Sequence, residues 1–311
     1  MTITMPRAPV YFISHGGPPS MYAEKSGPYQ AWGRVGQLIR RDIGQGKVDK
    51  KKGFVCVSAH WESDDTKGKI IEVNNNPGNP LIYDFYNFPT HYYSQTFHSS
   101  GPDGGVEVVK RALEAGGWEV KPVDRGLDHG LWVPFKIAFS QPPVPHAKPP
   151  TPSKETLDLI PPLIQISLPG DSSPKSAEKL GEVLGKLRGD GWGVVCTGQA
   201  VHNLRELGQA RSFGGRGTTY GQPFLTAFLQ AATSPLGDIG RASKSLFKRE
   251  DYRRAHPTPE HLMPLVVAAG AVQSGAGDSR GNVDGEEGEG KGEVIFEEED
   301  GPLGWAMVRW D

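Results

Sequence analysis

Five of the nine histidines of this chain stand in short motifs whose residue types suit binding a metal ion or moving a proton. They are His15 in FISHGGPP, His60 in VCVSAHWE, His129 in GLDHGLW, His202 in CTGQAVHNL and His261 in PTPEHLMPL. Imidazole is the commonest metal ligand in proteins, and its pKa is close enough to neutrality for it to accept and release protons. The motifs therefore predict a metal site, an acid–base site, or both.

Two of these histidines close apolar runs of strand length. His15 follows PVYFIS, His60 follows GFVCVSA, and small residues flank both. Continuous runs of this kind are typical of strands that are buried on both faces of a parallel sheet. Ligands of open α/β sheets bind beyond the carboxyl ends of the strands, so we expect the metal site at that edge.

Two further candidates, His202 and His261, lie later in the chain than His129. His202 comes shortly after a further apolar run, GWGVVCTG, and is expected to face the same edge of the sheet. His261 precedes the apolar run PLVVAAGAV, and Pro259 and Glu260 stand just before it. Because proline is favoured at the start of a helix, these residues predict the first helical turn here.

The elements that must position the histidines alternate between strands and helices. Strands are expected at 9–14, 53–59, 68–73, 118–123, 162–168 and 191–198, helices within 26–46 and at 104–117 and 174–189, and a last pair of strands around VIFEEE and WAMVRW. Such alternation favours an α/β fold with a central, mostly parallel sheet flanked by helices. We find no internal repeat and no clear boundary, and expect residues 1–311 to form a single domain.

Two segments of unusual composition predict flexible insertions. Residues 141–153 are rich in proline and predict an extended surface loop. Residues 274–293 are almost without apolar side chains and cannot bury a core of their own.

Bulk composition limits the partners and the location. Lys and Arg number 34 against 36 Asp and Glu, a formal net charge of -2, so neither nucleic acid nor a membrane surface is an expected partner. No apolar run approaches the length of a membrane span, and the first residues lack a signal-peptide pattern. Cys56 and Cys196 lie in strand-like segments and are expected to be buried thiols. We therefore expect a cytoplasmic protein.

The motifs, taken together and in order, resemble those of the class III extradiol ring-cleavage dioxygenase superfamily. SHGGPP, SAHWE, DHGLW, VHNL and HPTPEHLMPL run from residue 10 to about residue 270. The nearest branch is the DOPA 4,5-dioxygenase type, which is related to protocatechuate 4,5-dioxygenase. The resemblance implies an enzyme that opens the ring of a small catechol with O₂, giving a muconic semialdehyde.

The resemblance also implies a role for each histidine. His15, His60 and His261 match metal ligands, His202 matches an acid–base histidine, and His129 matches a pocket histidine that handles substrate or oxygen. The implied cofactor is one divalent metal ion, Fe(II) for activity.

One position departs from the wider superfamily. Other branches complete a facial triad of two histidines and one carboxylate, the usual ligand set of non-haem Fe(II) oxygenases. His261 stands at the carboxylate's position here, and the adjacent Glu260 is the competing ligand; we favour His261. A site of three histidines would also suit Zn(II).

An aromatic segment follows a loop rich in Asn, Pro and Gly. Tyr83, Asp84 and Phe85 begin it, and Phe88 and Pro89 continue it. This segment either caps the core or forms a wall against a planar ring, and the resemblance favours substrate binding. DOPA-like, caffeate-like and simpler catechols all suit such a wall. The sequence leaves the oligomeric state open.

Two other functions compete with ring cleavage. A zinc-dependent hydrolase could use the same histidines, because zinc also activates water. Asp128 and Glu260 are the only carboxylates in the five motifs that could serve it as a base. A binding protein without activity is the third reading, but it would not need acid–base histidines. The remaining histidines are expected to be structural or solvated.

Overall fold

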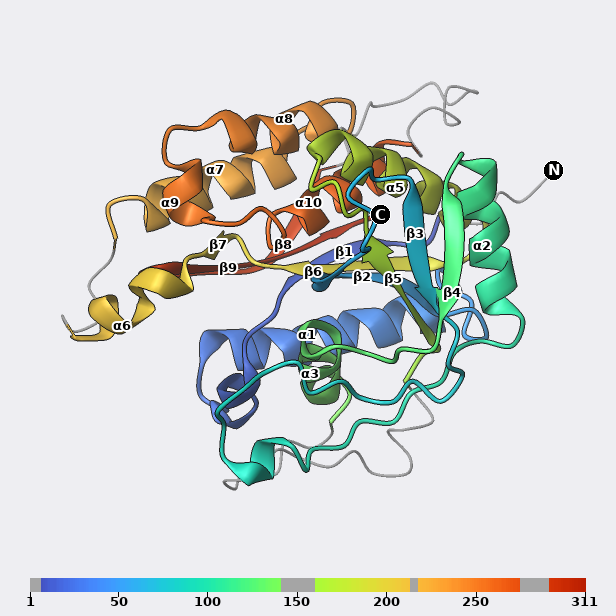
Figure 1. The fold of residues 1–311 in the computed structure, drawn as a ribbon, viewed down its shortest axis with the longest axis horizontal. Coiled ribbons are helices and arrows are strands. Elements are labelled where there is room, and N and C mark those ends of the chain that lie inside the picture. The colour runs from blue at the N-terminus through green and yellow to red at the C-terminus, as the bar shows by residue number, and fades with distance from the viewer. Residues whose placement is uncertain (1–6, 141–159, 213–217, 275–290) are drawn as a thin grey trace.

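The protein is built around one mixed sheet that runs through the computed structural model, which describes residues 7–140, 160–212, 218–274 and 291–311 (Figure 1). In the described part of the chain the strand order is β4-β3-β5-β2-β6-β1-β9-β7, and β8 pairs with β9. The strands are β1 (Val10–Ser14), β2 (Phe54–Glu62), β3 (Ile70–Asn74), β4 (Glu119–Val123), β5 (Leu163–Leu168), β6 (Gly193–Gly198), β7 (Val201–His202), β8 (Glu293–Asp300) and β9 (Leu303–Trp310).

The centre of the sheet is parallel and buried. Strands β5, β2, β6 and β1 are parallel neighbours, and every residue of β1, β5 and β6 is buried. The antiparallel pairs lie outside this centre, where β9 joins β1, β7 and β8, and where β3 touches β5. The predicted α/β fold with a mostly parallel central sheet is confirmed, and its parallel strands end at a common edge.

Helices cover both faces of the sheet, as Figure 1 shows. Helices α1 and α3 lie on one face, and α5, α7, α8 and α10 lie on the other. The helices are α1 (Gly27–Gly44), α2 (Gly105–Ala115), α3 (His129–Ala138), α5 (Pro174–Leu187), α6 (Leu204–Ser212), α7 (Gly221–Ala232), α8 (Ile239–Ser245), α9 (Tyr252–Ala255) and α10 (Met263–Gln273), with short 3₁₀ turns at Pro18–Tyr22, Thr90–Tyr92, Arg188–Asp190 and Leu246–Lys248. No described helix is both long and apolar enough to cross a membrane.

Local sequence signals explain why α1 forms where it does. The hydroxyl of Ser26 accepts a hydrogen bond from the backbone N–H of Tyr29 at 3.3 Å, which caps the start of the helix. A stripe of apolar residues then faces the sheet at helical spacing: Trp32, Val35 and Ile39. The helix therefore covers one face of the parallel strands.

The ends of two predicted elements differ from the structure. The helix expected from Pro259 begins only at Met263, so that prediction is wrong. Residues 257–262 form turns and bends, and Pro264 occupies the first helical turn, where its missing N–H costs nothing. Residues 275–290 of the predicted flexible segment 274–293 and the whole of 141–153 lie outside the described residues. Glu293, however, begins β8, because it pairs with Arg309.

Candidate metal centre

Five histidines from distant parts of the sequence meet at one edge of the sheet. His15 follows β1 directly, His60 lies near the end of β2, and His202 ends β7. His129 is the first residue of α3, and His261 lies in the turn before α10. The site therefore lies at the carboxyl ends of the central strands, where sequence analysis placed it.

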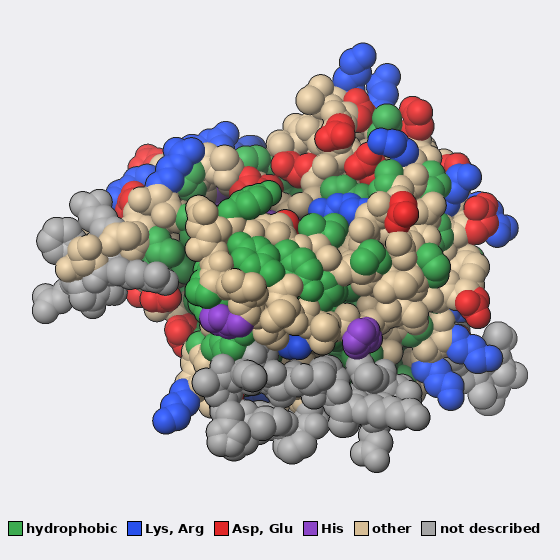
Figure 2. All heavy atoms as spheres, turned by 60° about the horizontal axis from the view of Figure 1, so that its bottom comes forward, with side chains coloured by type: hydrophobic (Ala, Val, Ile, Leu, Met, Phe, Trp, Pro, Cys, Tyr) green, Lys and Arg blue, Asp and Glu red, His purple; other side chains and the backbone are tan. Residues whose placement is uncertain are grey.

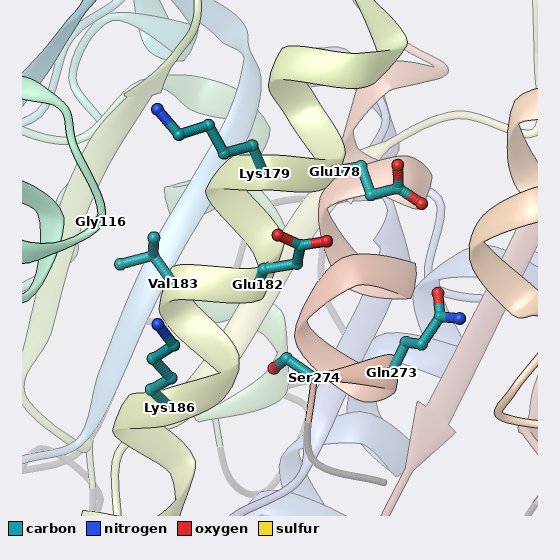
Figure 3. Close-up of a pocket in the computed structure, with 8 residues that line it drawn as sticks. All are labelled: Gly116, Glu178, Lys179, Glu182, Val183, Lys186, Gln273 and Ser274. Carbon is teal, nitrogen blue, oxygen red and sulfur yellow. The ribbon is translucent and has the colours of Figure 1, made fainter. Parts of the chain in front are cut away.

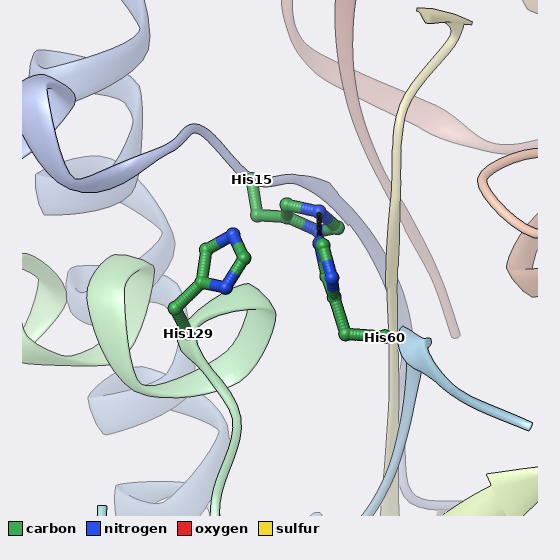
Figure 4. Close-up of side chains that lie close together, drawn as sticks. All are labelled: His15, His60 and His129. Atoms are coloured by element: carbon green, nitrogen blue, oxygen red, sulfur yellow. Dashed lines mark hydrogen bonds between the residues drawn. The ribbon is translucent and has the colours of Figure 1, made fainter. Parts of the chain in front are cut away.

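Three of the histidines point toward one another, as Figure 4 shows for His15, His60 and His129. The Nε2 atoms of His15 and His60 are 2.9 Å apart, and the ring centroids of His60 and His129 are 4.1 Å apart. One ring nitrogen from each of the three lies within 4.8 Å of the others. This group can hold a metal ion.

His261 lies beside the rings of His15 and His60. Its ring centroid lies 5.2 Å from that of His15 and 5.0 Å from that of His60. The rings of His261 and His202 are stacked, with centroids 3.5 Å apart and planes 15° apart. An imidazole binds a metal in its own ring plane, so two rings stacked face to face cannot share one ion. Only one of this stacked pair can therefore be a ligand of a common metal.

Glycines allow the histidine-bearing segments to approach closely. A Cβ atom at Gly130 would lie 2.6 Å from Oγ of Ser58 and 2.9 Å from the ring of His60. A Cβ atom at Gly198 would lie 2.4 Å from the carbonyl oxygen of His261. The starts of α3 and of the turn before α10 can pack against strands β2 and β6 only because these positions lack a side chain.

Carboxylates lie behind several of the histidines. Oε1 of Glu260 is 2.9 Å from Nδ1 of His261 and accepts a hydrogen bond from the hydroxyl of Thr258 at 2.8 Å. Oδ1 of Asp84 is 2.9 Å from Nδ1 of His129, off the line of a hydrogen bond, because it accepts the backbone N–H of the same residue. Sequence analysis missed this pairing of Asp84, although it is the only carboxylate in its aromatic segment.

Asp128, the carboxylate of the DHG motif, has a structural role. It is fully buried, and its oxygens accept hydrogen bonds from the hydroxyl of Ser58 at 2.8 Å and from the amide of Gln165. These bonds join the start of α3 to strands β2 and β5. Asp128 is therefore not a free base.

Burial keeps four of the clustered histidines neutral. Desolvation, followed by the charges of the neighbouring histidines, lowers the pKa of His15 and of His261 well below the ordinary value. The same causes lower the pKa of His202 to about 3, and desolvation with the charge of His129 lowers that of His60 to about 4. At neutral pH these side chains are uncharged, the form in which imidazole binds metals and accepts protons.

The residues fit a divalent metal ion by two further observations. Nε2 of His261 is buried and has no hydrogen-bond partner among the described residues, which is costly for a polar atom unless it binds a ligand. Two nitrogens bound at right angles to one metal at 2.0–2.1 Å are about 3 Å apart. The 2.9 Å between the Nε2 atoms of His15 and His60 matches that separation.

The aromatic segment predicted to contact substrate lies beside the histidines. Phe85 is buried, and its ring centroid is 5.8 Å from that of His129. Tyr83 lies one ring further out, with its centroid 6.0 Å from that of Phe85, and its hydroxyl donates to the carbonyl of Gln95. Tyr86, the next residue along, is 81% exposed. The segment thus runs from the metal centre to the surface.

The other described histidines are not members of the cluster, although His256 lies near enough to His202 and His261 for its charge to lower their pKa. His256 is fully buried, with its Nε2 2.9 Å from the carbonyl oxygen of Ala200, and so holds the loop that leads to His202. His91 and His98 are exposed, and His146 lies outside the described residues.

A groove, shown in Figure 3, lies away from the histidines. This groove of about 500 Å³ runs between α5 and the end of α10, and Glu178, Lys179, Glu182, Lys186 and Gln273 line it. Helix α10 has 11 residues and rises about 1.5 Å per residue, so the groove is about 16 Å from its first turn.

The face in Figure 2 shows acidic and basic side chains interspersed, in keeping with the small net charge.

The fold and the histidine cluster define an α/β protein with a group of histidines that could hold a metal ion at the carboxyl edge of its sheet. The chain belongs to the family of the catalytic LigB subunit of aromatic ring-opening dioxygenases, whose sequence model matches residues 9–288. The family is one of metal-dependent extradiol dioxygenases, and the predicted resemblance is confirmed.

Individual relatives agree with this membership. A 4,5-DOPA dioxygenase extradiol-like protein of Schizosaccharomyces pombe is 30% identical over 276 residues, which cover 86% of each chain. A 4,5-DOPA dioxygenase extradiol of Beta vulgaris is 28% identical over 84% of this chain and 86% of its own. A crystal structure of an uncharacterized protein from Escherichia coli K12 has a TM-score of 0.63 at 22% identity, covering 97% of this chain and 99% of that one. This last likeness shows the fold.

Proposed function

We propose that this protein is a metal-dependent extradiol dioxygenase that cleaves a small catechol, DOPA-like or caffeate-like, to a muconic semialdehyde. The observation that carries the proposal is the convergence of five histidines at one edge of the sheet, more than metal binding alone requires. Family membership supports ring opening, and the relatives named for DOPA support the substrate class.

We assign the ligands to His15, His60 and His261. Nε2 of His261 is free because Nδ1 faces Glu260, and Oε1 of Glu260 is already occupied by that ring and by Thr258. This arrangement supports His261 over Glu260 as the third ligand. A divalent metal bound there, Fe(II) for activity, would supply Lewis-acid activation of the catechol hydroxyls and bring catechol and O₂ together.

The remaining two histidines are proposed to move protons. His202 is only partly buried and is stacked on the ring of His261, so it is placed to accept a proton from a catechol hydroxyl and later return it. His129 lies between the ring of His60 and that of Phe85 and is proposed to assist by contacting substrate or oxygen. Phe85, with Tyr83, is proposed as the wall that orients the ring.

The two carboxylates considered as the base of a hydrolase are both hydrogen-bonded. Asp128 is buried in hydrogen bonds with Ser58 and Gln165, and Oε1 of Glu260 is paired with His261. This arrangement favours a dioxygenase over a hydrolase that relies on either carboxylate. We also propose a cytoplasmic location, which the free, buried thiols of Cys56 and Cys196 support.

The experiment that tests the proposal is anaerobic loading with Fe(II), followed by oxygen uptake and absorbance scans with DOPA, caffeate and protocatechuate. We expect a yellow semialdehyde that forms in step with O₂ consumption, one molecule of each per catechol. A protein that binds the metal stoichiometrically yet consumes no O₂ with any catechol would contradict the proposal. Ester or amide hydrolysis by the Zn(II) form would then identify a hydrolase.

A further inference from the structure

Asp84 lies between two of the clustered histidines. Its Oδ1 accepts the backbone N–H of His129 at 2.9 Å and lies 2.9 Å from Nδ1 of the same residue. Its Oδ2 lies 3.5 Å from Nδ1 of His60 and is buried, without a hydrogen-bond partner among the described residues. One carboxylate therefore faces the Nδ1 atoms of both rings.

The loop that carries Asp84 is fixed by its own contacts. The backbone N–H of Ile82 donates to the carbonyl of Leu127 at 2.8 Å, and the indole N–H of Trp132 donates to the carbonyl of Ile82 at 3.0 Å. The hydroxyl of Tyr93 donates to the carbonyl of Phe85 at 3.2 Å. Asp84 is thus held in place from both sides, and none of these contacts depends on a metal.

A carboxylate that is ionised can only accept hydrogen bonds, so a neutral imidazole facing it must carry its proton on the facing nitrogen. The other nitrogen then keeps its lone pair. For His60 that other nitrogen is Nε2, the atom 2.9 Å from Nε2 of His15. The geometry points to Asp84 as a positioning residue that fixes His60 in the tautomer protonated at Nδ1, which turns the lone pair of His60 Nε2 into the metal centre.

The charge state of Asp84 agrees with this role. The carboxyl is partly exposed, at 21%, and its Oδ1 accepts the backbone N–H of His129, a bond that favours the ionised form. At neutral pH the group is a carboxylate. The inference depends on the proposed function only in naming a metal as what His60 binds, because the tautomer is a property of the metal-free protein.

Asp84→Asn provides the sharpest test, because it replaces one acceptor with a donor at nearly constant shape. The amide oxygen can still accept the backbone N–H of His129, and the amide nitrogen then faces Nδ1 of His60. That nitrogen donates, so the metal-free His60 accepts at Nδ1 and carries its proton on Nε2, and a metal can bind Nε2 only after that proton has moved. A residue with a purely structural role would not invert a tautomer.

The tautomers are read by ¹⁵N NMR of histidine-labelled, metal-free protein at pH 8, with signals assigned through single His→Gln variants. We expect His60 to be protonated at Nδ1 in the wild type and at Nε2 in Asp84→Asn. The affinity for Zn(II) alone, measured by competition with a chelator, should fall by about 10–100-fold. Asp103→Asn, which removes an exposed carboxylate before α2, is the control and should change neither.

Unchanged His60 signals in Asp84→Asn, with a Zn(II) affinity within twofold of the wild type, would overturn the inference. If that variant does not fold, Asp84→Ala replaces it and should give a mixture of His60 tautomers; the wild-type tautomer alone would again overturn the inference. Neither readout involves a catechol. Failure of the proposed function, which appears only as absent oxygen uptake, is therefore distinguishable from failure of this inference.

Discussion

At the scale of single residues, the chemistry depends on which nitrogen of each imidazole is free. The stacked pair His202 and His261 illustrates this, because stacking excludes a shared metal and forces a division of roles. The ring with a carboxylate behind it, His261, has its Nε2 directed into the cluster. The other ring, His202, is the one that we propose for proton transfer.

Replacing His202 with Phe should separate these roles. Phe keeps a ring to stack on His261 but cannot exchange a proton, so we expect full metal content and turnover lowered by about 10²–10⁴-fold. Metal analysis and oxygen uptake with the best catechol measure both quantities. Loss of the metal in His202→Phe would show that His202 is a ligand and that the division is wrong.

Glu260 and His261 can be told apart by paired substitutions. His261→Gln should remove a ligand and abolish stoichiometric Fe(II) or Zn(II) binding. Glu260→Gln should keep the metal but weaken its affinity by about 10–100-fold, because only the partner of Nδ1 is altered. Chelator competition ranks the two variants. A complete loss of metal in Glu260→Gln alone would make the carboxylate the ligand.

At the scale of elements, the site depends on how closely α3 approaches β2. Helix α3 delivers His129, and its second residue, Gly130, has no room for a side chain against Ser58 and His60. The network of Asp128 locks this approach in place. The contact between helix and strand is therefore part of the metal centre.

Gly130→Ala should disturb that contact. We expect the free energy of unfolding to fall by about 1–3 kcal/mol from overpacking, and Zn(II) affinity to fall as well, since the added methyl group meets the His60 ring. Urea unfolding and chelator competition measure the two effects. Gly33→Ala in α1 is the matched control: its Cβ would meet nothing within 4 Å, so it should be neutral or stabilising. Equal behaviour of the two variants would refute this account of α3.

At the scale of the whole molecule, long-range contacts tie the ends of the chain to the sheet that supports the site. Arg309 of β9 forms a bidentate ion pair with the buried Asp42 of α1, at 2.9 and 3.0 Å, and the hydroxyl of Tyr11 in β1 donates to the same carboxylate. Three elements far apart in sequence are joined beneath one face of the sheet. The cluster can form only when this whole architecture is in place.

Lys136 predicts how stability depends on pH. The side chain is 1% exposed, and desolvation lowers its pKa to about 8 from the ordinary 10.5. Between these values the unfolded chain binds more protons at this residue, so its contribution to the free energy of unfolding rises with pH by up to about 3 kcal/mol.

The comparison with Lys136→Met isolates that contribution. The stability of the variant relative to the wild type should decline as pH increases from 8 to 10.5, and it should be constant between pH 6 and 7. Urea unfolding of both proteins across this range measures the difference. A difference that does not change with pH would mean that Lys136 is not desolvated when folded.

The sequence by itself determined all the longer strands, helices α1, α2 and α5, and the list of chemically capable residues, but it predicted neither α3 nor α6 to α9. Apolar runs before His15 and His60 identified buried strands, because side chains buried on both faces leave a continuous pattern. The site edge followed from the rule for parallel strands. The start of α10 was misplaced because Pro259 and Pro264 offer two candidate first turns, and only the packing of the turn around His261 selects the second.

Only the tertiary structure decided which groups meet. No spacing in the sequence shows that Asp84 faces two histidines or that His202 stacks on His261. Nor does it show that Asp128 accepts hydrogen bonds from Ser58 and Gln165. Local patterns report burial and secondary structure, which depend on neighbours along the chain. Hydrogen-bond partners and tautomers depend on neighbours in space, and these are set when residues from 15 to 261 are brought to one edge of the sheet.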